Sequence, residues 1–498
     1  MEWPTFCDLA TPYGGTAAGA ITMYETELKN LDTNFGKNLT VGSARSILIG
    51  MWIPLVMGSL LTMGYSIINS IWVGQIMGSR AMSAVAVTMP IIQLTSALIS
   101  GVATGASILI ARYFGANDDE KMKNVVFNAW AIAVVLIVLV TGGGILFCEQ
   151  LLWAMGTPAD VVSMTSGYMK IIFASFIFST AFSLISSILR GVGDSKKPMI
   201  FVLLSTLINA VLDPLLIMGA GPIPKMGLNG AGLASLLASA TACVLGYLHM
   251  RKQKALLKGS SMSGIDFQTM WQLLKIGIPT AMQQILFAVG SIFIVVFVNS
   301  FGVAATAAYG AITRIESFIT LPGIAMSMAL SIITGQNLGA SKPERIKEFF
   351  KSGVVISAVY TLLISFITIV FPHALMSMFV NDPATVAVGV DYFRIVGYAY
   401  LFISLMFVAN GIINGAGKTF ISFILSFVSI CIVRIPLAGF MQHTSMGIKG
   451  IWIALIISYT ISVALFMTYY LRGIQGNRKI IIANSVKLTE NGTKEAGW

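Results

Sequence analysis

The sequence predicts an all-α polytopic membrane protein with twelve transmembrane helices, arranged as two six-helix lobes of parallel orientation. Of the 498 residues, 56% are hydrophobic and 10% are charged, whereas soluble proteins carry about 25% charged residues. Apolar runs near the length of about 20 residues that a bilayer requires recur along the chain. A transmembrane barrel would instead show short alternating strands. The two halves also repeat one another, which predicts the division into lobes.

The apolar runs predict each of the twelve spans. Those of the first half are 47–74, 82–110, 124–147, 166–189, 199–219 and 230–250. Those of the second half are 275–299, 305–334, 352–372, 393–414, 419–440 and 449–471.

The spans divide the chain into two lobes with polar segments around them. The lobes are predicted to cover 45–250 and 273–472. Residues 1–44 are polar and lack the apolar core of a signal peptide, so they are predicted to be a disordered cytoplasmic leader. The Lys-, Ser- and Gly-rich stretch 251–272 is predicted to be a cytoplasmic linker, and 473–498 a cytoplasmic tail.

Charge placement predicts the orientation in the membrane, because Lys and Arg collect on the cytoplasmic side. With the N-terminus placed inside, most Lys and Arg, Arg190 among them, fall in inner segments. The outer segments hold only Arg80, Lys225 and Lys449. Both termini are therefore predicted to be cytoplasmic, in a multi-pass protein of the cell membrane. The same placement accounts for the net charge of +11 without nucleic acid as a partner.

The chain is predicted to be an internal duplication. The segment RYFGANDDEKMK at 112–123 resembles QNLGASKPERIK at 336–347, and RGVGDSKKP at 190–198 resembles NGAGKTF at 414–420. The offset between the copies is nearly constant. Because each half has an even number of spans, both halves enter the membrane in the same direction. An axis along the membrane normal would relate them, a layout that transporters use for movement about a central site.

A carboxylate lies inside the fifth predicted span, at Asp213, four residues after Asn209. On a helix the two share one face. Ionisable groups inside a membrane usually mark an ion or substrate path. The alternative is that Asp213 caps a helix broken by Pro214. Asn69 and Ser235 are predicted to lie at a similar depth in the first lobe, where ordinary interhelical hydrogen bonding is the alternative.

These oxygen-bearing side chains suit either a proton or Na⁺. No structural metal site is predicted, and a possible Na⁺ site is assigned to Asp213 and Asn209. The Gly101–Gly105 and Gly411–Gly415 pairs have the spacing that permits close helix packing.

The second lobe offers a different set of candidates, Arg314, Glu316 and Arg434. Arg314 and Glu316 are two residues apart and do not face each other on a straight helix. Each is expected to pair with another helix, and Arg434 is one candidate partner for Glu316. Structural ion pairing and a gating or coupling role are both open for this set.

Three motifs carry a family resemblance. YSIINSIWVG at 65–74, NAVLDP at 209–214 and GQNLGASKPERI at 335–346, within twelve spans in two parallel halves, resemble the multidrug and toxic compound extrusion (MATE) transporters of the prokaryotic branch. The resemblance implies a secondary active antiporter that exports organic, often cationic and amphipathic compounds in exchange for H⁺ or Na⁺. It also implies two lobes that alternate access to a central site.

The resemblance further implies a coupling site in the first lobe. In similar transporters this site has an Asp on the first helix, an Asn and an Asp on the fifth, and a Thr on the sixth. Asn209 and Asp213 match the fifth-helix pair, and Ser235 keeps the hydroxyl of the sixth. Asn69 stands where the first-helix Asp is expected, and its amide cannot take up a proton.

One alternative function is a flippase for a lipid-linked sugar precursor, which is expected to need a strongly basic central cavity. Only Arg314 and Arg434 are expected in that position. An enzyme is not predicted, because no nucleophile–base pair, metal-ligand cluster or nucleotide-binding loop is evident. The expected partners are small organic molecules and the lipid bilayer, for a monomer without a cofactor.

Overall fold

The computed structural model describes residues 36–157, 159–219, 224–252 and 264–475, so the predicted leader up to residue 35 and the predicted tail from residue 476 lie outside it. Within these ranges, the residues from Asn38 onward form one compact unit. Every regular element in the described ranges is helical. Twelve helical stretches in these ranges are long and apolar enough to cross a membrane. The predicted all-α, twelve-span fold is confirmed.

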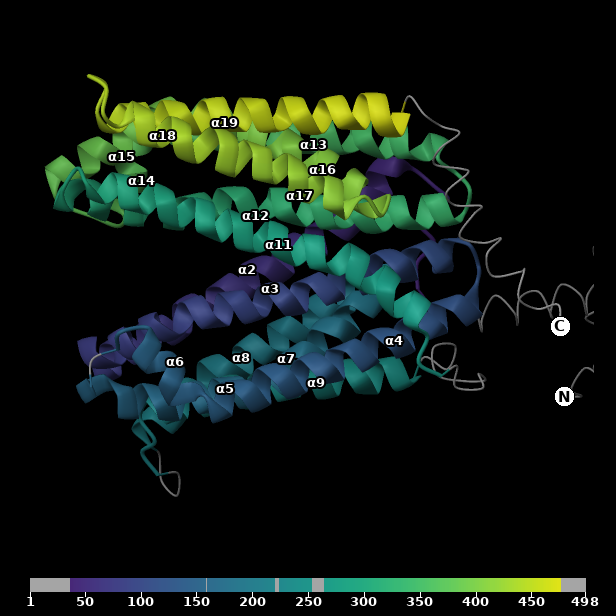
Figure 1. Cartoon of the computed structure of the whole chain (residues 1–498), viewed down its shortest axis with the longest axis horizontal. Coiled ribbons are helices and arrows are strands. Elements are labelled where there is room, and N and C mark those ends of the chain that lie inside the picture. The colour runs from purple at the N-terminus through teal and green to yellow at the C-terminus, as the bar shows by residue number, and fades with distance from the viewer. Residues whose placement is uncertain (1–35, 158, 220–223, 253–263, 476–498) are drawn as a thin grey trace, which may run out of the picture. The chain divides into compact units, whose positions relative to one another are not determined.

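The first lobe contains six spans (Figure 1). They are α2 (Ala44–Met77), α3 (Ser79–Gly115), α4 (Asp119–Ile137) continued by the π-helical η1 (Val138–Gly142) and α5 (Gly143–Leu146), α7 (Ala159–Gly191), α8 (Lys196–Met218) and α9 (Leu228–Lys252). The short α6 (Cys148–Ala154) connects α5 to α7.

The second lobe repeats this plan. Its spans are α11 (Phe267–Asn299), α12 (Val303–Gly339), α13 (Glu344–Val370), α15 (Pro383–Val396) with η2 (Gly397–Ala399) and α16 (Tyr400–Gly415), α17 (Thr419–Phe427) with η3 (Val428–Arg434) and α18 (Ile435–Met441), and α19 (Ile448–Tyr469) with η4 (Tyr470–Gln475). The short α14 (Pro372–Ser377) precedes α15.

The tenth span begins earlier than predicted, at Pro383 instead of residue 393. The Asp382 carboxylate accepts a hydrogen bond from the Thr385 backbone N–H at 2.9 Å, and Pro383 occupies the first turn. Both are strong helix-start signals. The apolar pattern alone missed them, because Asp391 interrupts the apolar run inside this helix.

Two glycines hold the lobes together at one end of the bundle. A Cβ at Gly115, at the end of α3, would lie 2.1 Å from the Gln336 backbone oxygen of α12. A Cβ at Gly339, at the end of α12, would lie 1.9 Å from the Arg112 backbone oxygen of α3. The contact is reciprocal, as expected where the two copies of the duplicated motif meet. We call this end, formed by the turns at 115–119 and 339–344, the closed end, and the opposite end the open end.

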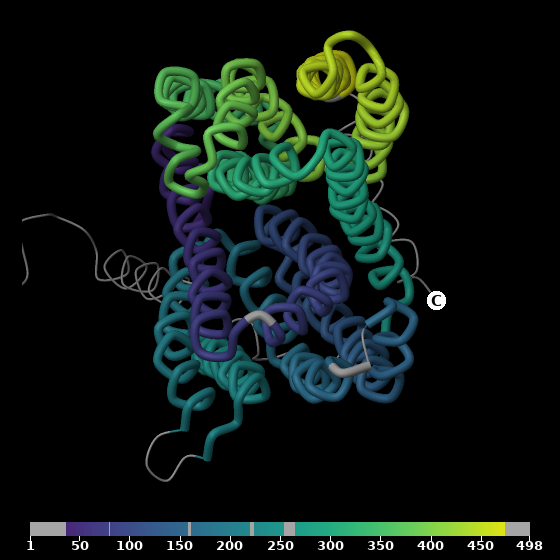
Figure 2. Tube along the Cα trace, turned by 90° about the vertical axis from the view of Figure 1, so that its left-hand side faces the viewer, coloured from purple at the N-terminus to yellow at the C-terminus, as the bar shows by residue number. Residues whose placement is uncertain are grey.

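The first helix of each half crosses to the other lobe. In Figure 2, α2 (purple) and α11 (teal) pass between the two groups of helices on opposite sides. The Trp52 indole N–H of α2 donates to the Pro322 carbonyl of α12 at 2.9 Å. A Cβ at Gly101 of α3 would lie 2.5 Å from the Gly277 oxygen of α11. The predicted packing role of Gly101 is confirmed, and Gly411 likewise packs on the Ser327 oxygen.

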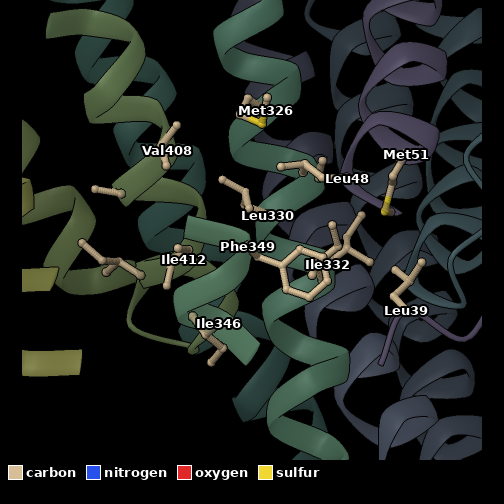
Figure 3. Close-up of a cluster of buried hydrophobic side chains, with 14 of the residues drawn as sticks. Leu39, Leu48, Met51, Met326, Leu330, Ile332, Ile346, Phe349, Val408 and Ile412 are labelled. Carbon is tan, nitrogen blue, oxygen red and sulfur yellow. The ribbon is translucent and has the colours of Figure 1, made fainter. Parts of the chain in front are cut away.

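A buried cluster at the closed end shows the consequence of this crossing. Figure 3 shows Leu48 and Met51 of α2 among side chains of α12, α13 and α16. Leu39 belongs to the same cluster and is 1% exposed. Its backbone N–H donates to the Gln336 side-chain oxygen at 3.0 Å. Residues 38–43 therefore differ from the disordered leader predicted for 1–44, because one apolar side chain and its backbone are anchored on the second lobe.

We predict that Gly339→Ala destabilises the protein by about 1–3 kcal/mol, because the new methyl group meets backbone that cannot move aside. The measurement is thermal unfolding of the purified protein in detergent. Gly310→Ala is the matched control on the same helix, since no atom lies within 4 Å of its Cβ position. Equal unfolding temperatures for the two variants would contradict the role given to the closed-end contact.

Candidate functional site

Asn209 and Asp213 lie one turn apart on α8, and both side chains are 0% exposed. The Asn209 amide Nδ2 donates to Asp213 Oδ1 at 3.3 Å. The helix continues past Pro214 to Met218. Asp213 therefore does not cap a broken helix, which was the alternative interpretation. The pair lies inside the first lobe as a buried amide and carboxyl.

Ser235 of α9 accepts hydrogen bonds from two polar side chains of α2. Its Oγ accepts from the Tyr65 hydroxyl at 2.6 Å and from the Asn69 amide at 3.4 Å. The Ser235 hydroxyl itself donates to the Ala231 carbonyl at 3.0 Å. The helices that carry these residues are neighbours, since α8 packs on both α2 and α9. The structure thus brings together the four residues predicted from sequence and adds Tyr65.

Close packing of α8 on α9 produces this arrangement. A Cβ at Gly230 would lie 2.4 Å from the Leu216 backbone oxygen, so only glycine permits the approach. Two turns along the pair, the Ser205 hydroxyl donates to the Ala238 carbonyl at 2.8 Å. Asp213 on α8 and Ser235 on α9 lie between these two contacts. The helices are thus held at the separation at which short polar side chains meet.

Two oxygens of this first-lobe cluster have no partner. Asn209 Oδ1 and Asp213 Oδ2 are buried without a hydrogen bond. Buried polar atoms in native proteins almost always have one, and an exception calls for an explanation such as an ion or a functional role. Ser235 Oγ, in contrast, already accepts two hydrogen bonds. The cluster can therefore offer one free carboxyl oxygen and one free amide oxygen to a small cation.

A separate cavity of about 930 Å³ lies between the lobes. This volume falls in the range of small-molecule sites. None of Asn69, Asn209, Asp213 and Ser235 lines it. The first lobe contributes a wholly polar wall: Gln93, Ser100, Thr104, Ser107, Ser187 and Arg190. The second lobe contributes polar, apolar and aromatic side chains.

Sequence reasoning missed this polar wall, although a signal was present. Gln93, Ser100, Thr104 and Ser107 recur at spacings of three, four and seven residues along α3, so they share one helical face. An apolar stripe on the helix of a soluble protein marks the face that packs on the core. A polar stripe within an apolar membrane span marks, in the same way, the face that lines a polar cavity. Searching each span for such stripes would have found the cavity wall.

Glu316 of α12 and Arg434 at the end of η3 both line the cavity, but they do not pair as predicted. The Tyr392 hydroxyl donates a short hydrogen bond to the Glu316 carboxylate. Arg434 Nε donates to Ser458 Oγ at 3.2 Å, and its guanidinium lies 4.7 Å from the ring centre of Tyr459. The aromatic and hydroxyl groups of neighbouring helices thus satisfy each charge locally, which a search for oppositely charged partners overlooked.

Two arginines lie elsewhere than the sequence predicted: Arg314 lies outside the cavity wall and Arg190 lies in it. Arg314 is exposed and does not line the cavity, although it was expected to be central. The helix turns by about 200° over the two residues from Arg314 to Glu316, so only Glu316 faces the cavity. Arg190 was assigned to an inner segment, yet it lies in the last turn of α7 and lines the cavity.

A family model described as MatE matches residues 54–215 and 279–440, one match in each lobe. The chain belongs to the MatE family. This confirms the resemblance that the sequence motifs predict. Members of the family are transporters, and the family is one of multidrug efflux.

Two curated relatives of this MatE-family chain show how the family's members are named. A probable multidrug resistance protein of Bacillus subtilis, YoeA, is 27% identical over 423 residues, which cover 84% of this chain and 91% of the relative. An FAD transporter of Shewanella oneidensis is 26% identical over 414 residues, which cover 82% of this chain and 90% of the relative.

A solved structure supports the fold. The outward-facing conformation of a multidrug resistance MATE family transporter superposes with a TM-score of 0.83 at 21% identity, over 90% of this chain and 99% of that one. At this identity the likeness concerns the fold of the MatE-family chain.

We predict that Ser235→Ala costs about 1–3 kcal/mol of stability, because it leaves the Tyr65 and Asn69 donors without their acceptor. Ser239→Ala on the same helix is the control, since its hydroxyl donates only to the Leu236 carbonyl one turn earlier. Chemical unfolding in detergent measures both variants. If Ser235→Ala is no less stable than Ser239→Ala, the first-lobe cluster is not the tightly linked unit described here.

Proposed function

We propose that the protein is a secondary active antiporter that exports amphipathic organic compounds across the cell membrane in exchange for H⁺ or Na⁺. The observation that carries this proposal is the separation of two sites. A ligand-sized cavity lies between the lobes, and a buried carboxyl with a free oxygen lies apart from it, inside the first lobe. One site suits the exported compound and the other suits the driving ion.

Alternating access is the mechanism that this architecture supports. The cavity runs from Arg190, near the closed end, to Val295 and Val296, near the open end of α11. Switching requires the contact at Gly115 and Gly339 to separate. Pro54 in α2 and Pro279 in α11 lie at matching positions within the two crossing helices. Proline removes one helical hydrogen bond, so these are the natural places for the crossing helices to bend.

We propose H⁺ as the driving ion. Na⁺ binding needs several oxygens with free lone pairs, whereas the first-lobe cluster has two buried oxygens without a partner, one on Asn209 and one on Asp213. A proton needs only one. The family resemblance implies a second carboxyl at the position of Asn69, but an amide stands there. Asp213 is therefore the one group in this cluster that can carry the proton.

We further propose that both termini face the cytoplasm, on the placement of Lys and Arg. The closed end would then be the cytoplasmic end, and the cavity would face the outside. The oligomeric state is proposed to be monomeric. The cationic substrate implied by the family resemblance stays a prediction, and the relatives' names include both multidrug resistance proteins and an FAD transporter.

We predict that Asp213→Asn abolishes gradient-driven transport. Purified protein is reconstituted into vesicles, and uptake of fluorescent organic compounds of either charge is measured under an imposed pH gradient. The wild type is expected to accumulate at least one compound, and Asp213→Asn is expected to match protein-free vesicles. The isosteric amide keeps the packing but cannot carry the proton.

Glu149→Gln is the matched control, because the Glu149 carboxylate is exposed at the open end, where it pairs with Lys170 at 3.2 Å. This variant is expected to transport like the wild type. Undiminished transport by Asp213→Asn would contradict the role of Asp213. Uptake driven by a Na⁺ gradient and not by a pH gradient would replace H⁺ with Na⁺ as the driving ion.

A further inference from the structure

Arg190 points into the cavity from its closed end. It lies in the last turn of α7, and its Nη2 donates to Ser187 Oγ at 3.1 Å, three residues earlier. Side chains on a helix lean toward its N-terminus, which for α7 is the open end. The guanidinium is therefore directed along the helix into the cavity that it lines.

Within the described part of the chain, no carboxylate forms an ion pair with this arginine. Among the residues that the structure describes, none of the ion pairs within 4.0 Å involves Arg190. The acid nearest in sequence, Asp194, is engaged elsewhere, because its Oδ1 accepts from the backbone N–H groups of Lys196 and Lys197. A guanidinium has five N–H donors, of which one hydrogen bond, to Ser187, is accounted for. Charged side chains within membrane spans are usually paired or mark a ligand path.

Hydroxyl groups from three helices surround the same region. A Cβ at Gly191 would lie 3.0 Å from the Ser107 backbone oxygen, which brings α3 beside the end of α7. The Gln336 amide donates to the Gly191 carbonyl at 3.0 Å, which brings α12 to the same level. Ser331 lies about one and a half turns before Gln336 on α12 and lines the cavity. Ser107, Ser187 and Ser331 thus come from the three helices that meet near the arginine. The Ser107 hydroxyl donates to the Thr104 carbonyl at 2.9 Å and the Ser187 hydroxyl to the Ser183 carbonyl at 2.9 Å, so Ser331 is the one of the three whose hydroxyl is free.

The Ser331 hydroxyl is a donor without a partner. Its side chain is 5% exposed, and its Oγ forms no hydrogen bond. Because buried hydroxyls are nearly always bonded, this group is a second, independent sign that a polar ligand atom belongs here. A guanidinium and a free hydroxyl are donors, so the matching ligand atom is an acceptor that carries negative charge.

The rest of the cavity fits an apolar body attached to such a group. Above the arginine, apolar and aromatic side chains of the second lobe line the wall, including Phe287, Met328 and Phe407. Among the described lining residues the charged ones are Arg190, Arg434 and Glu316. With two arginines and one carboxylate, the wall favours an acidic or zwitterionic molecule over a simple organic cation.

We propose that Arg190, with the hydroxyl of Ser331, binds the phosphate or carboxylate group of an amphipathic substrate at the closed end of the cavity. This inference rests on the proposed transport function and specifies its substrate class. The shared chemistry is an oxyanion on an apolar body, which a soluble aromatic phosphate or a lysolipid phosphate can supply.

Binding to the purified full-length protein in non-ionic detergent tests the proposal. The probes are 1-naphthyl phosphate and naphthyl-1-trimethylammonium, which share an aromatic body and differ in charge. Lysophosphatidic acid in mixed micelles is the lipid probe. Titration calorimetry gives the dissociation constants. The wild type is expected to bind at least one of the two phosphates more tightly than it binds the ammonium compound.

Arg190→Gln is expected to weaken phosphate binding about tenfold or more, as loss of a charge-assisted hydrogen bond predicts. Its affinity for the ammonium compound is expected to stay equal or to rise. Arg314→Gln is the matched control, because it removes the same charge from an exposed arginine outside the cavity wall. If Arg190→Gln does not fold, Arg190→Lys and Ser331→Ala replace it, each expected to weaken phosphate binding severalfold.

Several outcomes decide the proposal. Binding of lysophosphatidic acid but not of naphthyl phosphate supports the subsite with a lipid as its source, and the reverse supports a soluble substrate. Equal phosphate affinity in Arg190→Gln and Arg314→Gln overturns it, as does a wild type that prefers the ammonium compound. Binding is measured without an ion gradient and transport with one, so a failure of ion coupling and a failure of this subsite are told apart.

Discussion

The structure depends on one reciprocal contact, in which backbone from each copy of a duplicated motif occupies the space that a side chain would fill in the other. The Gln336 backbone oxygen lies close to where a Cβ of Gly115 would be, and the Arg112 backbone oxygen lies close to where a Cβ of Gly339 would be. Because both contacts involve backbone, the distance between α3 and α12 is fixed at the closed end and grows toward the open end. The cavity is the space that this wedge leaves, and its floor, with Arg190, lies just above the contact.

The same geometry separates the polar side chains that line the cavity from the buried carboxyl of Asp213. Polar side chains along α3 and α12 face the wedge and line the cavity, whereas Asp213 is enclosed by α8, α9 and the outer part of α2. A charge inside one lobe and a ligand between two lobes can influence each other only through the helices that both contact. The helix that joins the first-lobe cluster to the second lobe is α2, which carries Tyr65 and Asn69 at one end and packs on the second lobe through Trp52 at the other.

Sequence was sufficient for the fold, because twelve spans, a duplication and a charge bias are properties of long stretches. It singled out Asp213, because a lone carboxylate in an apolar span stands out, but it missed Tyr65, which donates to Ser235. The sequence did not predict which side chains line the cavity, because this depends on where a helix ends and which face a residue occupies. Arg190 looks like a loop residue until α7 is seen to end at Gly191, and Arg314 differs from Glu316 only in the face it occupies. Tyr392 could not be matched with Glu316 because they are far apart in sequence.

The crossing of α2 has a consequence for how the protein is made. Leu39 and the first turns of α2 are buried against α12, α13 and α16. Leu39 and its partner Gln336 are 297 residues apart in sequence. The span α2 therefore cannot complete its packing until nearly three hundred further residues have been synthesised. Each half has a buried cluster of its own, but the cluster at the closed end is complete only when both halves have been made.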